Sequence, residues 1–267
     1  MKVQRKVVVV TGAGSGMGRE LTLELVRRGA KVAAVDMRAE TLAETVKLAT
    51  ALGGQVESFI LDVSDAAAVA ALPGKVKERL GEADALINNA GIIQKFVHIN
   101  ELSIEDASHV MNVNFYGPFT LIKAFLPGLL TRPEAHILNV SSMGAYAPVP
   151  GQSVYGASKA AIKLLTEGLR SELMGSKVGV TVVFPGAIAT NIAANSGMGD
   201  MTVDSDAGKG MKTTPAPVAA KAMVDAIESN NPRICIGSDA KLMDRLSRLN
   251  PIMAANLIYK QMAALLK

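Results

Sequence analysis

The stretch "KVVVVTGAGSGMG", residues 6–18, decides the fold of this chain. Four consecutive valines form a short β-branched run, which is typical of a strand that is buried on both faces. A glycine cluster follows directly, and behind it Leu21, Leu25 and Val26 have helical spacing. A strand, a glycine-rich turn and a helix in this order favour a dinucleotide site, because the N-terminus of a helix attracts the charge of a pyrophosphate.

The glycines of this turn have separate tasks. Gly12 permits the sharp turn, Gly16 lets the backbone approach the pyrophosphate, and Gly18 permits close packing of the helix on the sheet. Their spacing is T-G-x-x-x-G-x-G, which differs from the commoner G-x-G-x-x-G, although Gly14 gives a partial overlap. A turn that uses glycine only for its backbone freedom is the alternative.

Asp36 ends the second predicted strand, twenty residues after Gly16. A carboxylate at about this spacing accepts hydrogen bonds from the adenosine ribose hydroxyls and repels a 2′-phosphate. We therefore expect NAD to be preferred over NADP. Arg19 and Arg38 lie close in the sequence, and they either weaken this preference or are ordinary solvated helix residues.

Strands and helices alternate along the rest of the chain. Strands are predicted at 6–10, 31–36, 58–62, 85–91, 136–142, 179–186 and 233–237, and helices at 17–29, 38–52, 65–80, 101–131, 153–173 and 215–229. Repeated β-α-β units predict an α/β fold, a Rossmann-type doubly wound parallel sheet of about seven strands with helices on both faces.

The length and composition favour one large domain. The chain has 267 residues, of which 49% are hydrophobic and 19% charged, enough apolar material for a sizeable core. We expect a single dinucleotide-binding and catalytic domain over residues 1–237. It includes a substrate flap at about 191–214, and a helical extension follows over residues 238–267.

Several classes of function are disfavoured by residue usage. Cys235 is the only cysteine, which excludes an internal disulfide and fits a reducing compartment. The three histidines have no close spacing, so no metal site is expected. The net charge of +4 comes from the basic tail after residue 240, which argues against a broad nucleic-acid-binding face. No apolar run approaches the ~18 residues of a membrane span, and a cytoplasmic location is expected.

A tyrosine and a lysine stand four positions apart in "VYGASKAAI", residues 154–162. On a helix, positions i and i+4 lie on the same face, so Tyr155 and Lys159 would project side by side. An ammonium next to a phenol favours the phenolate, and the pair can act as a general base. Taken alone, the spacing also fits two surface residues that share a face by chance.

Further motifs follow in a fixed order: "NNAG" at 88–91, "NVNFYG" at 112–117, "VSS" at 140–142, "YGASK" at 155–159 and "FPGAIAT" at 184–190. With the glycine turn, this ordered set resembles the short-chain dehydrogenase/reductase family in its shorter single-domain form, over about residues 5–237. The resemblance implies a nicotinamide-dependent oxidoreductase.

The resemblance also implies a catalytic tetrad of Asn114, Ser142, Tyr155 and Lys159. Tyr155 would be the general acid and base, and Lys159 would lower its pKa and hold the nicotinamide ribose. Ser142 would hydrogen-bond the substrate oxygen where charge develops. Asn114 would bind a water that links Lys159 to solvent, unless its amide only satisfies backbone groups. Ser142 and Tyr155 would also be the substrate-binding residues.

The same resemblance implies a set of cofactor contacts around the adenine, the ribose, the pyrophosphate and the nicotinamide. The expected residues are Gly12, Ser15, Gly16, Met17, Gly18, Asp36, Asp62, Val63, Asn89, Ala90, Gly91, Tyr155, Lys159, Pro185, Gly186, Ile188 and Thr190.

The expected reaction is the interconversion of an alcohol and a ketone by hydride transfer, with a secondary alcohol favoured over a primary one. Met198, Met201 and Met211 in the flap favour an apolar small-molecule substrate. Two alternatives stay open. One is an epimerase or dehydratase that acts on a sugar nucleotide, which usually carries T-G-x-x-G-x-x-G and a larger C-terminal domain. The other is a non-catalytic protein that senses a dinucleotide and regulates a partner.

The C-terminal end departs from the family pattern. Leu242, Leu246 and Leu249 have helical spacing, and Pro251 predicts the start of a second helix. These helices either cap the substrate cleft or form a basic amphipathic surface for a membrane or a partner. The tetramer of many relatives is therefore in doubt, and a homodimer or another homo-oligomer is expected.

Overall fold

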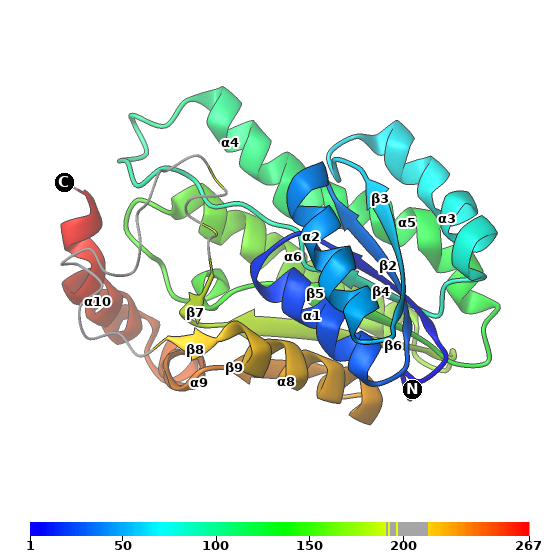
Figure 1. Cartoon of the computed structure of the whole chain (residues 1–267). Coiled ribbons are helices and arrows are strands. Elements are labelled where there is room, and N and C mark those ends of the chain that lie inside the picture. The colour runs from blue at the N-terminus through cyan, green and yellow to red at the C-terminus, as the bar shows by residue number, and fades with distance from the viewer. Residues whose placement is uncertain (191, 193–195, 197–212, 267) are drawn as a thin grey trace.

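The computed structural model describes residues 1–190, 192, 196 and 213–266. Seven parallel strands form one sheet, as predicted, and their order in the sheet is β3-β2-β1-β4-β5-β6-β9 (Figure 1). The strands are β1 (Val7–Thr11), β2 (Lys31–Asp36), β3 (Gln55–Ile60), β4 (Ala85–Asn88), β5 (Ala135–Val140), β6 (Val178–Pro185) and β9 (Arg233–Ile236).

The valines of β1 contact both cores of the protein. Val8 and Val10 belong to the core under α1 (Gly16–Arg27), α2 (Ala39–Ala51) and α8 (Ala216–Ser229). Val7 and Val9 belong to the opposite core, and all four side chains are almost fully buried. The helices that supply this opposite core are α3 (Ala66–Leu80), α5 (Gly117–Leu130) and α6 (Ser153–Glu172). Alternation along one strand thus joins the two layers of helices.

The order of the strands creates a crevice between β1 and β4. From β1 the chain moves to β2 and β3 on one side, and it then returns to β4 on the other side. Loops therefore diverge at the carboxyl ends of β1 and β4, which is where open parallel sheets bind ligands.

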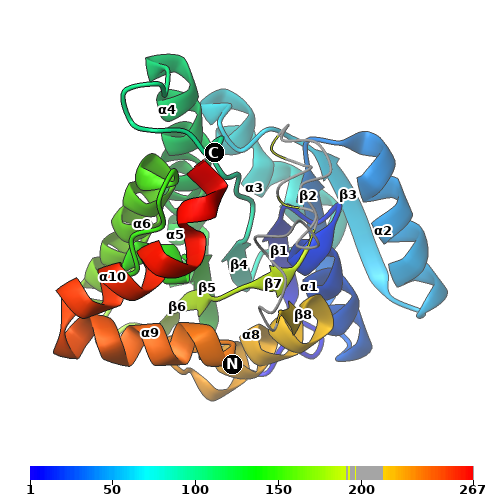
Figure 2. The ribbon, with the colours of Figure 1, turned by 90° about the vertical axis from the view of Figure 1, so that its left-hand side faces the viewer.

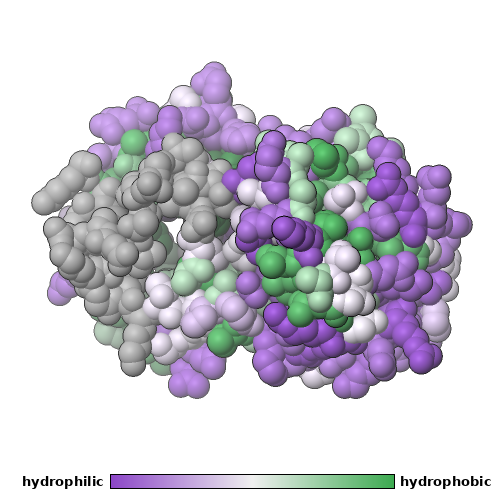
Figure 3. All heavy atoms as spheres, viewed as in Figure 1, coloured by the Kyte–Doolittle hydropathy of each residue, from purple (hydrophilic) through white to green (hydrophobic). Residues whose placement is uncertain are grey.

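Hydrophilic side chains form most of the right-hand rim of the molecule in Figure 3.

The predicted helix over 101–131 is divided in the structure. It consists of α4 (Ile104–Met111), a π-helical turn (Asn112–Tyr116) and α5. The wider turn lies at Asn114, which the sequence marked as a site residue, and π-turns of this kind are frequent at functional sites. Periodicity alone did not reveal it, because a π-turn shifts the apolar stripe by only one residue.

Other boundaries also differ. A small sheet of β7 (Ile188–Ala189) and β8 (Thr214–Pro215) was not predicted, since two-residue strands carry no periodicity. β3 begins at Gln55, where it pairs with Lys31 of β2, rather than at residue 58. The predicted flap at 191–214 lies outside the described residues, apart from Ile192, Ser196, Thr213 and Thr214.

The predicted C-terminal helices are present as α9 (Ser238–Leu249) and α10 (Pro251–Met262). Buried residues of both helices pack on a short segment that follows β5 in the sequence and contains Met143 and Ala147. Figure 2 shows the two helices along one side of the molecule, below and beside α6. Among the described residues, no helix combines the length and the apolar character needed to cross a bilayer.

His136 is buried in β5, away from the crevice. Its side chain is 1% exposed, and its Nε2 lies 2.8 Å from Oγ1 of Thr181, whose hydroxyl donates to the carbonyl of Asn231. Burial, with a smaller contribution from the charge of the N-terminus, lowers the pKa of His136 from 6.5 to about 3. The neutral ring is therefore part of the folded state.

This lowered pKa predicts a loss of stability in acid. Between pH 6.5 and pH 3 the unfolded chain binds a proton at this position and the folded chain does not, so stability is complete above pH 6.5 and declines as the pH falls through this range. The expected slope is up to ~1.4 kcal/mol per pH unit, measured by urea unfolding. The free energy of unfolding of His136→Gln should change less with pH than that of the wild type. The exposed control His109→Gln should show the same pH dependence as the wild type. Equal pH dependence in all three proteins would contradict this account.

Candidate functional site

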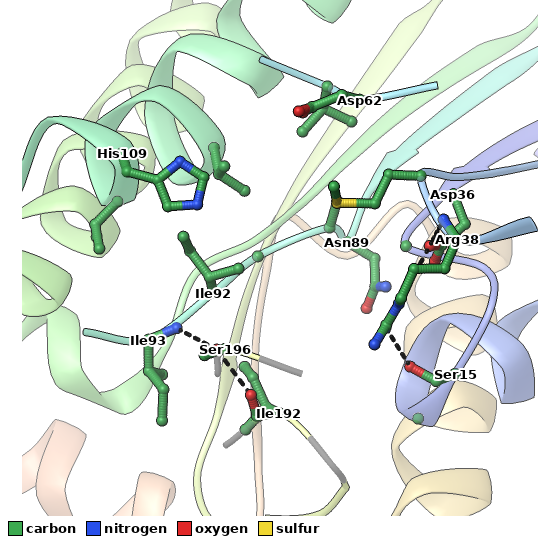
Figure 4. Close-up of a pocket in the computed structure, with 18 of the residues that line it drawn as sticks. Ser15, Asp36, Arg38, Asp62, Asn89, Ile92, Ile93, His109, Ile192 and Ser196 are labelled. Carbon is green, nitrogen blue, oxygen red and sulfur yellow. Dashed lines mark hydrogen bonds and ion pairs between the residues drawn. The ribbon is translucent and has the colours of Figure 1, made fainter. Parts of the chain in front are cut away.

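A cavity of about 400 Å³ lies at the carboxyl ends of β1 and β4 (Figure 4). Its volume is within the usual range of small-molecule sites. Most of the residues predicted to contact a cofactor line it: Gly12, Ser15, Gly16, Met17, Asp36, Asp62, Val63, Asn89, Ala90, Gly91 and Thr190. Segments far apart in the sequence thus meet at one crevice.

The glycine turn is packed too closely for side chains. Gly12 has a φ of +68°, and a Cβ there would lie 2.9 Å from the Cα of Ala90. A Cβ at Gly18 would collide with the carbonyl oxygen of Gly12. Thr11 joins this turn to β4, because its hydroxyl oxygen accepts from the N–H groups of Asn89 and Ala90 at 3.1 and 3.0 Å. The turn and the end of β4 therefore form one rigid wall.

Asp36 holds the glycine turn from the end of β2. Its carboxylate accepts from the N–H of Gly14 at 2.9 Å and from the N–H of Arg38 at 3.0 Å. A carboxylate has more acceptor positions than these two, so one remains for a ligand in the cavity. The guanidinium of Arg38 donates to Ser15 at 3.4 Å across the same end of the cavity, as Figure 4 shows. A carboxylate and a guanidinium thus stand together at this end.

The opposite end of the cavity is formed by the chain after β4. Ile92 and Ile93 line it, together with His109 of α4. Ser196 contacts this segment, because its hydroxyl oxygen accepts from the N–H of Ile93 at 3.1 Å and its hydroxyl donates to the carbonyl of Ile192 at 2.7 Å. No pattern in the sequence predicts these contacts, since serine in a loop is common.

The predicted Ser142, Tyr155 and Lys159 lie together beside the cavity. The Tyr155 ring and the Ser142 hydroxyl oxygen both lie next to Gly144, where a Cβ would be 3.4 Å from the ring and 3.5 Å from that oxygen. Nζ of Lys159 lies 5.9 Å from the centroid of the tyrosine ring. Lys159 is 4% exposed, and its ammonium donates to the carbonyl of Val140 at 3.1 Å. A Cβ at Gly91 would lie 3.1 Å from this ammonium, so the glycine makes room for it at the cavity wall.

Burial is the largest cause of the pKa shifts of Tyr155 and Lys159. It raises the pKa of Tyr155 above 10, and the hydrogen bond from Ser142 opposes that increase. Burial also lowers the pKa of Lys159 to about 8. The resemblance implies a tyrosine pKa lowered by Lys159, whereas burial of the phenol raises the pKa of Tyr155 in this structure.

The side chain of Asn114 forms hydrogen bonds with the backbone of Ile92, a residue that lines the cavity. Its side chain accepts from the N–H of Ile92 and donates to the carbonyl of Ile92, both at 2.9 Å. It also donates to Oγ of Ser158 at 3.0 Å, and the Ser158 hydroxyl donates to the carbonyl of Tyr155. The side chain of Asn114 thus fixes Ile92 to α6, which fits the alternative considered from the sequence.

Gln94 caps the helix that carries Tyr155. Its side-chain oxygen accepts from the N–H groups of Val154 and Tyr155 at 2.8 and 2.9 Å, and its amide donates to the carbonyl of Gly151 at 2.9 Å. Gln152 returns a hydrogen bond to the carbonyl of Gln94 at 2.6 Å. The first N–H groups of α6 are thus satisfied by a side chain about sixty positions away, in place of a local cap.

The predicted Pro185, Gly186 and Ile188 are not among the described residues that line the cavity. The turn after β6 is instead held by α9, because Asp239 accepts from the N–H of Ala187 at 2.7 Å. A Cβ at Gly186 would collide with this carboxylate. Thr190, at the end of the same motif, does line the cavity and faces Gly16.

Sequence reasoning missed four residues that hold this site together: Thr11, Gln94, Ser158 and Asp239. Thr11 and Ser158 lie inside motifs and could have been noticed there. Gln94 and Asp239 lie outside every motif and act over long sequence separations. A single sequence contains no signal for such contacts.

The cavity fits a dinucleotide. The first turn of α1, Gly16 to Arg19, contains no acidic residue, so its N–H groups can receive a pyrophosphate. The side-chain oxygen of Asn89 is buried and has no hydrogen-bond partner in the part of the chain that is described. Backbone walls at Gly12 and Gly91 leave space that any side chain would fill.

Comparisons with known proteins agree with this geometry. Residues 6–201 match the family model described as short chain dehydrogenase. The SadH protein of Mycobacterium tuberculosis is 38% identical over 250 residues, which cover 91% of this chain and 90% of that protein.

Two solved structures are also similar. A short-chain dehydrogenase/reductase from Burkholderia phymatum in complex with NAD has a TM-score of 0.84 and 28% identity, and the match covers 94% of this chain and 98% of that one. A short-chain dehydrogenase from Burkholderia cenocepacia in complex with NADP has a TM-score of 0.81 and 28% identity, with coverage of 97% and 99%.

The capping by Gln94 predicts a local effect on α6. Gln94→Met removes the acceptor of two buried N–H groups, and we expect a loss of about 1–3 kcal/mol in the free energy of unfolding. Hydrogen exchange should accelerate by about tenfold or more at Val154 and Tyr155, because the first turn opens locally. Thr166→Val is the matched control, since it removes a buried hydrogen bond with Asn139 from the same helix, farther along. Equal exchange at residues 154 and 155 in both variants would contradict the capping role.

Proposed function

The chain belongs to the short-chain dehydrogenase/reductase family of oxidoreductases, and we propose that it interconverts a secondary alcohol and a ketone with NAD as the preferred cofactor. The observation that carries this proposal is the convergence of Ser142, Tyr155 and Lys159 beside a cavity with backbone walls. A phenol and an ammonium side by side next to a dinucleotide-shaped cavity suit proton transfer at a substrate oxygen.

The residues that would hold the cofactor follow from their places in the cavity. Gly12, Gly16 and the first turn of α1 would receive the pyrophosphate, and Asp36 the adenosine ribose. Asp62 and Val63 would enclose the adenine. Further contacts are proposed for the remaining residues of the cavity wall: Ser15, Met17, Asn89, Ala90, Gly91 and Thr190. When bound, the nicotinamide supplies a hydride acceptor or donor.

The tyrosine side chain would move the proton of the reaction. In the reducing direction, the Tyr155 phenol donates its proton to the substrate oxygen as that oxygen gains negative charge; in the oxidising direction, the phenolate takes the hydroxyl proton. The Ser142 hydroxyl would hydrogen-bond the same oxygen. Because burial raises the pKa of Tyr155, the phenol is protonated at neutral pH, the state that reduction of a ketone requires.

Lys159 and Asn114 would support this proton transfer. The ammonium of Lys159, close to the tyrosine ring, stabilises a phenolate once it forms, and it would also hold the nicotinamide ribose. A proton path through Asn114 to solvent stays a proposal, because the Asn114 amide is already engaged with Ile92 and Ser158. Such a path would therefore use a backbone group of the π-turn rather than the Asn114 side chain.

The substrate and the setting of the enzyme are also proposals. Apolar residues line part of the cavity, among them Ile92, Ile93 and Val113, and support an apolar small-molecule substrate. A cytoplasmic location and a homo-oligomer remain the expectation from composition and family. We also propose that residues 1–237 form one domain and that residues 238–267 form an extension of it.

We expect NADH to bind about tenfold more tightly than NADPH, a difference of ~1.4 kcal/mol, because the Asp36 carboxylate repels a 2′-phosphate. Nicotinamide fluorescence measures both affinities, and the absence of tryptophan keeps the signal clear. Asp36→Asn should reduce the difference between the two affinities, whereas Asp65→Asn, at the cap of α3, should leave it unchanged. Tighter binding of NADPH would overturn the proposed preference and identify Arg38 as the stronger influence.

Tyr155→Phe tests the reaction itself. The ring remains but the proton is lost, so turnover of a panel of secondary alcohols and ketones should fall by about 10²- to 10⁴-fold. Binding of NADH should change little. Tyr259→Phe, on the exposed surface of α10, is the control for a lost hydroxyl and should behave as the wild type. NADH binding without turnover in any assay of the wild type would instead support a regulatory protein.

A further inference from the structure

The turn between α9 and α10 carries an unusual set of exposed apolar side chains. Leu249 is 85% exposed and Ile252 is 73% exposed, and they stand on either side of the turn at Asn250. Leu242, Met253 and Tyr259 are exposed on the same two helices. We call these five residues the apolar edge. Figure 2 shows the turn at an outer corner of the molecule.

The apolar edge is not needed to hold the helices in place. Met243 of α9 and Ile258 of α10 are buried on the inner side, where they pack in one cluster with Met143. Asn250 caps α10, because its side-chain oxygen accepts from the N–H of Met253 at 2.9 Å. The pair of helices is therefore anchored and capped independently of the outward side chains. Exposed apolar side chains that gather on one part of a surface, as these do on two adjacent helices, mark an interaction surface.

Every exposed charge on these helices is basic. Lys241, Arg245, Arg248 and Lys260 are exposed in the described part of the extension. The two acidic residues in the range 238–266 interact with residues outside the extension. Asp239 accepts from the N–H of Ala187 at 2.7 Å, and Asp244 forms an ion pair with Arg233 at 2.8 Å.

Asp244 also contacts Arg248 at 3.2 Å, so Arg248 is partly neutralised. The three remaining cations, Lys241, Arg245 and Lys260, have no ion pair within the described residues. An anionic partner would therefore meet uncompensated positive charge on both helices of the extension.

We propose that the apolar edge and its basic residues dock the enzyme on an anionic lipid surface. An exposed helix with apolar side chains on one edge and lysine or arginine beside them is the arrangement that inserts into the headgroup region of such a bilayer. The arginines and lysines are attracted by the surface charge of the lipid, and the apolar side chains then enter the interface.

The same charges disfavour other occupants. Two copies of the chain that paired through this surface would place basic residues opposite basic residues, which destabilises a contact. A nucleic acid would use the cations but would leave the apolar edge without a partner, because its affinity comes mainly from phosphate contacts. The combination of both features fits a lipid interface.

Vesicle sedimentation tests the proposal with the full chain. The wild type should pellet with vesicles of phosphatidylglycerol at low salt and not with vesicles of phosphatidylcholine. Leu249→Ser with Ile252→Ser should lower the bound fraction by about tenfold, since two apolar side chains no longer enter the interface. Arg245→Glu with Lys260→Glu should abolish binding.

Matched controls separate this surface from non-specific effects. Leu164→Ser removes an apolar side chain from α6 that is 68% exposed, and Lys47→Glu with Lys75→Glu changes the net charge by the same amount elsewhere. Both controls should pellet as the wild type does. Equal losses in the controls would overturn the proposal, and so would wild-type protein that stays in the supernatant.

One further outcome would also overturn it. If the wild type forms a dimer without vesicles and Leu249→Ser with Ile252→Ser makes it monomeric, the apolar edge binds a second copy. Light scattering after size exclusion distinguishes the two cases. Neither measurement depends on NADH or on a substrate, so the docking proposal stands or falls separately from the proposed reaction.

Discussion

The backbone of Tyr155 is held at both ends, and the site depends on this attachment. Its N–H donates to the side chain of Gln94, and its carbonyl accepts from Ser158, which Asn114 holds in turn. Asn114 also binds both polar groups of the Ile92 backbone. The chain segment that lines the cavity and the helix that carries the tyrosine are thereby one hydrogen-bonded unit. The cavity wall at Ile92 and the side chain of Tyr155 cannot move apart without breaking several buried hydrogen bonds.

Burial of this unit sets its chemistry. Removal of solvent raises the pKa of Tyr155 and lowers that of Lys159 to about 8, so burial favours the neutral form of both groups. Perturbed pKa values of two titratable groups that lie close together are typical of functional sites. The carbonyl of Val140 keeps the ammonium in place at 3.1 Å. The hydroxyl of Ser141, at the end of the same strand, donates to the Lys159 carbonyl at 2.7 Å, which aligns Ser142 with the helix.

Much of the fold was predictable, and the reasons are local. The valines at residues 7–10 are buried on both faces, as a continuous apolar run predicts. Helix positions followed from periodicity, and the structure adds caps such as Asp65, whose carboxylate accepts from the N–H groups of Ala67 and Ala68. The π-turn at Asn114 and the strand pair of β7 and β8 did not follow, since neither alters the spacing of apolar residues enough to detect.

The sequence by itself determined the alternation of strands and helices, the glycine turn, and the residue types from which a tyrosine–lysine site is built. Those features depend on neighbours within about one turn of helix or one strand, where spacing fixes which side chains share a face. Only the tertiary structure decided that Gln94 caps α6, that Asp36 holds the glycine turn as well as facing the cavity, and that Asp239 holds the turn after β6. Each of these contacts joins residues that are distant in the sequence. Their partners are chosen by how the layers pack around the sheet, because a buried polar group must find a hydrogen bond wherever the fold places it.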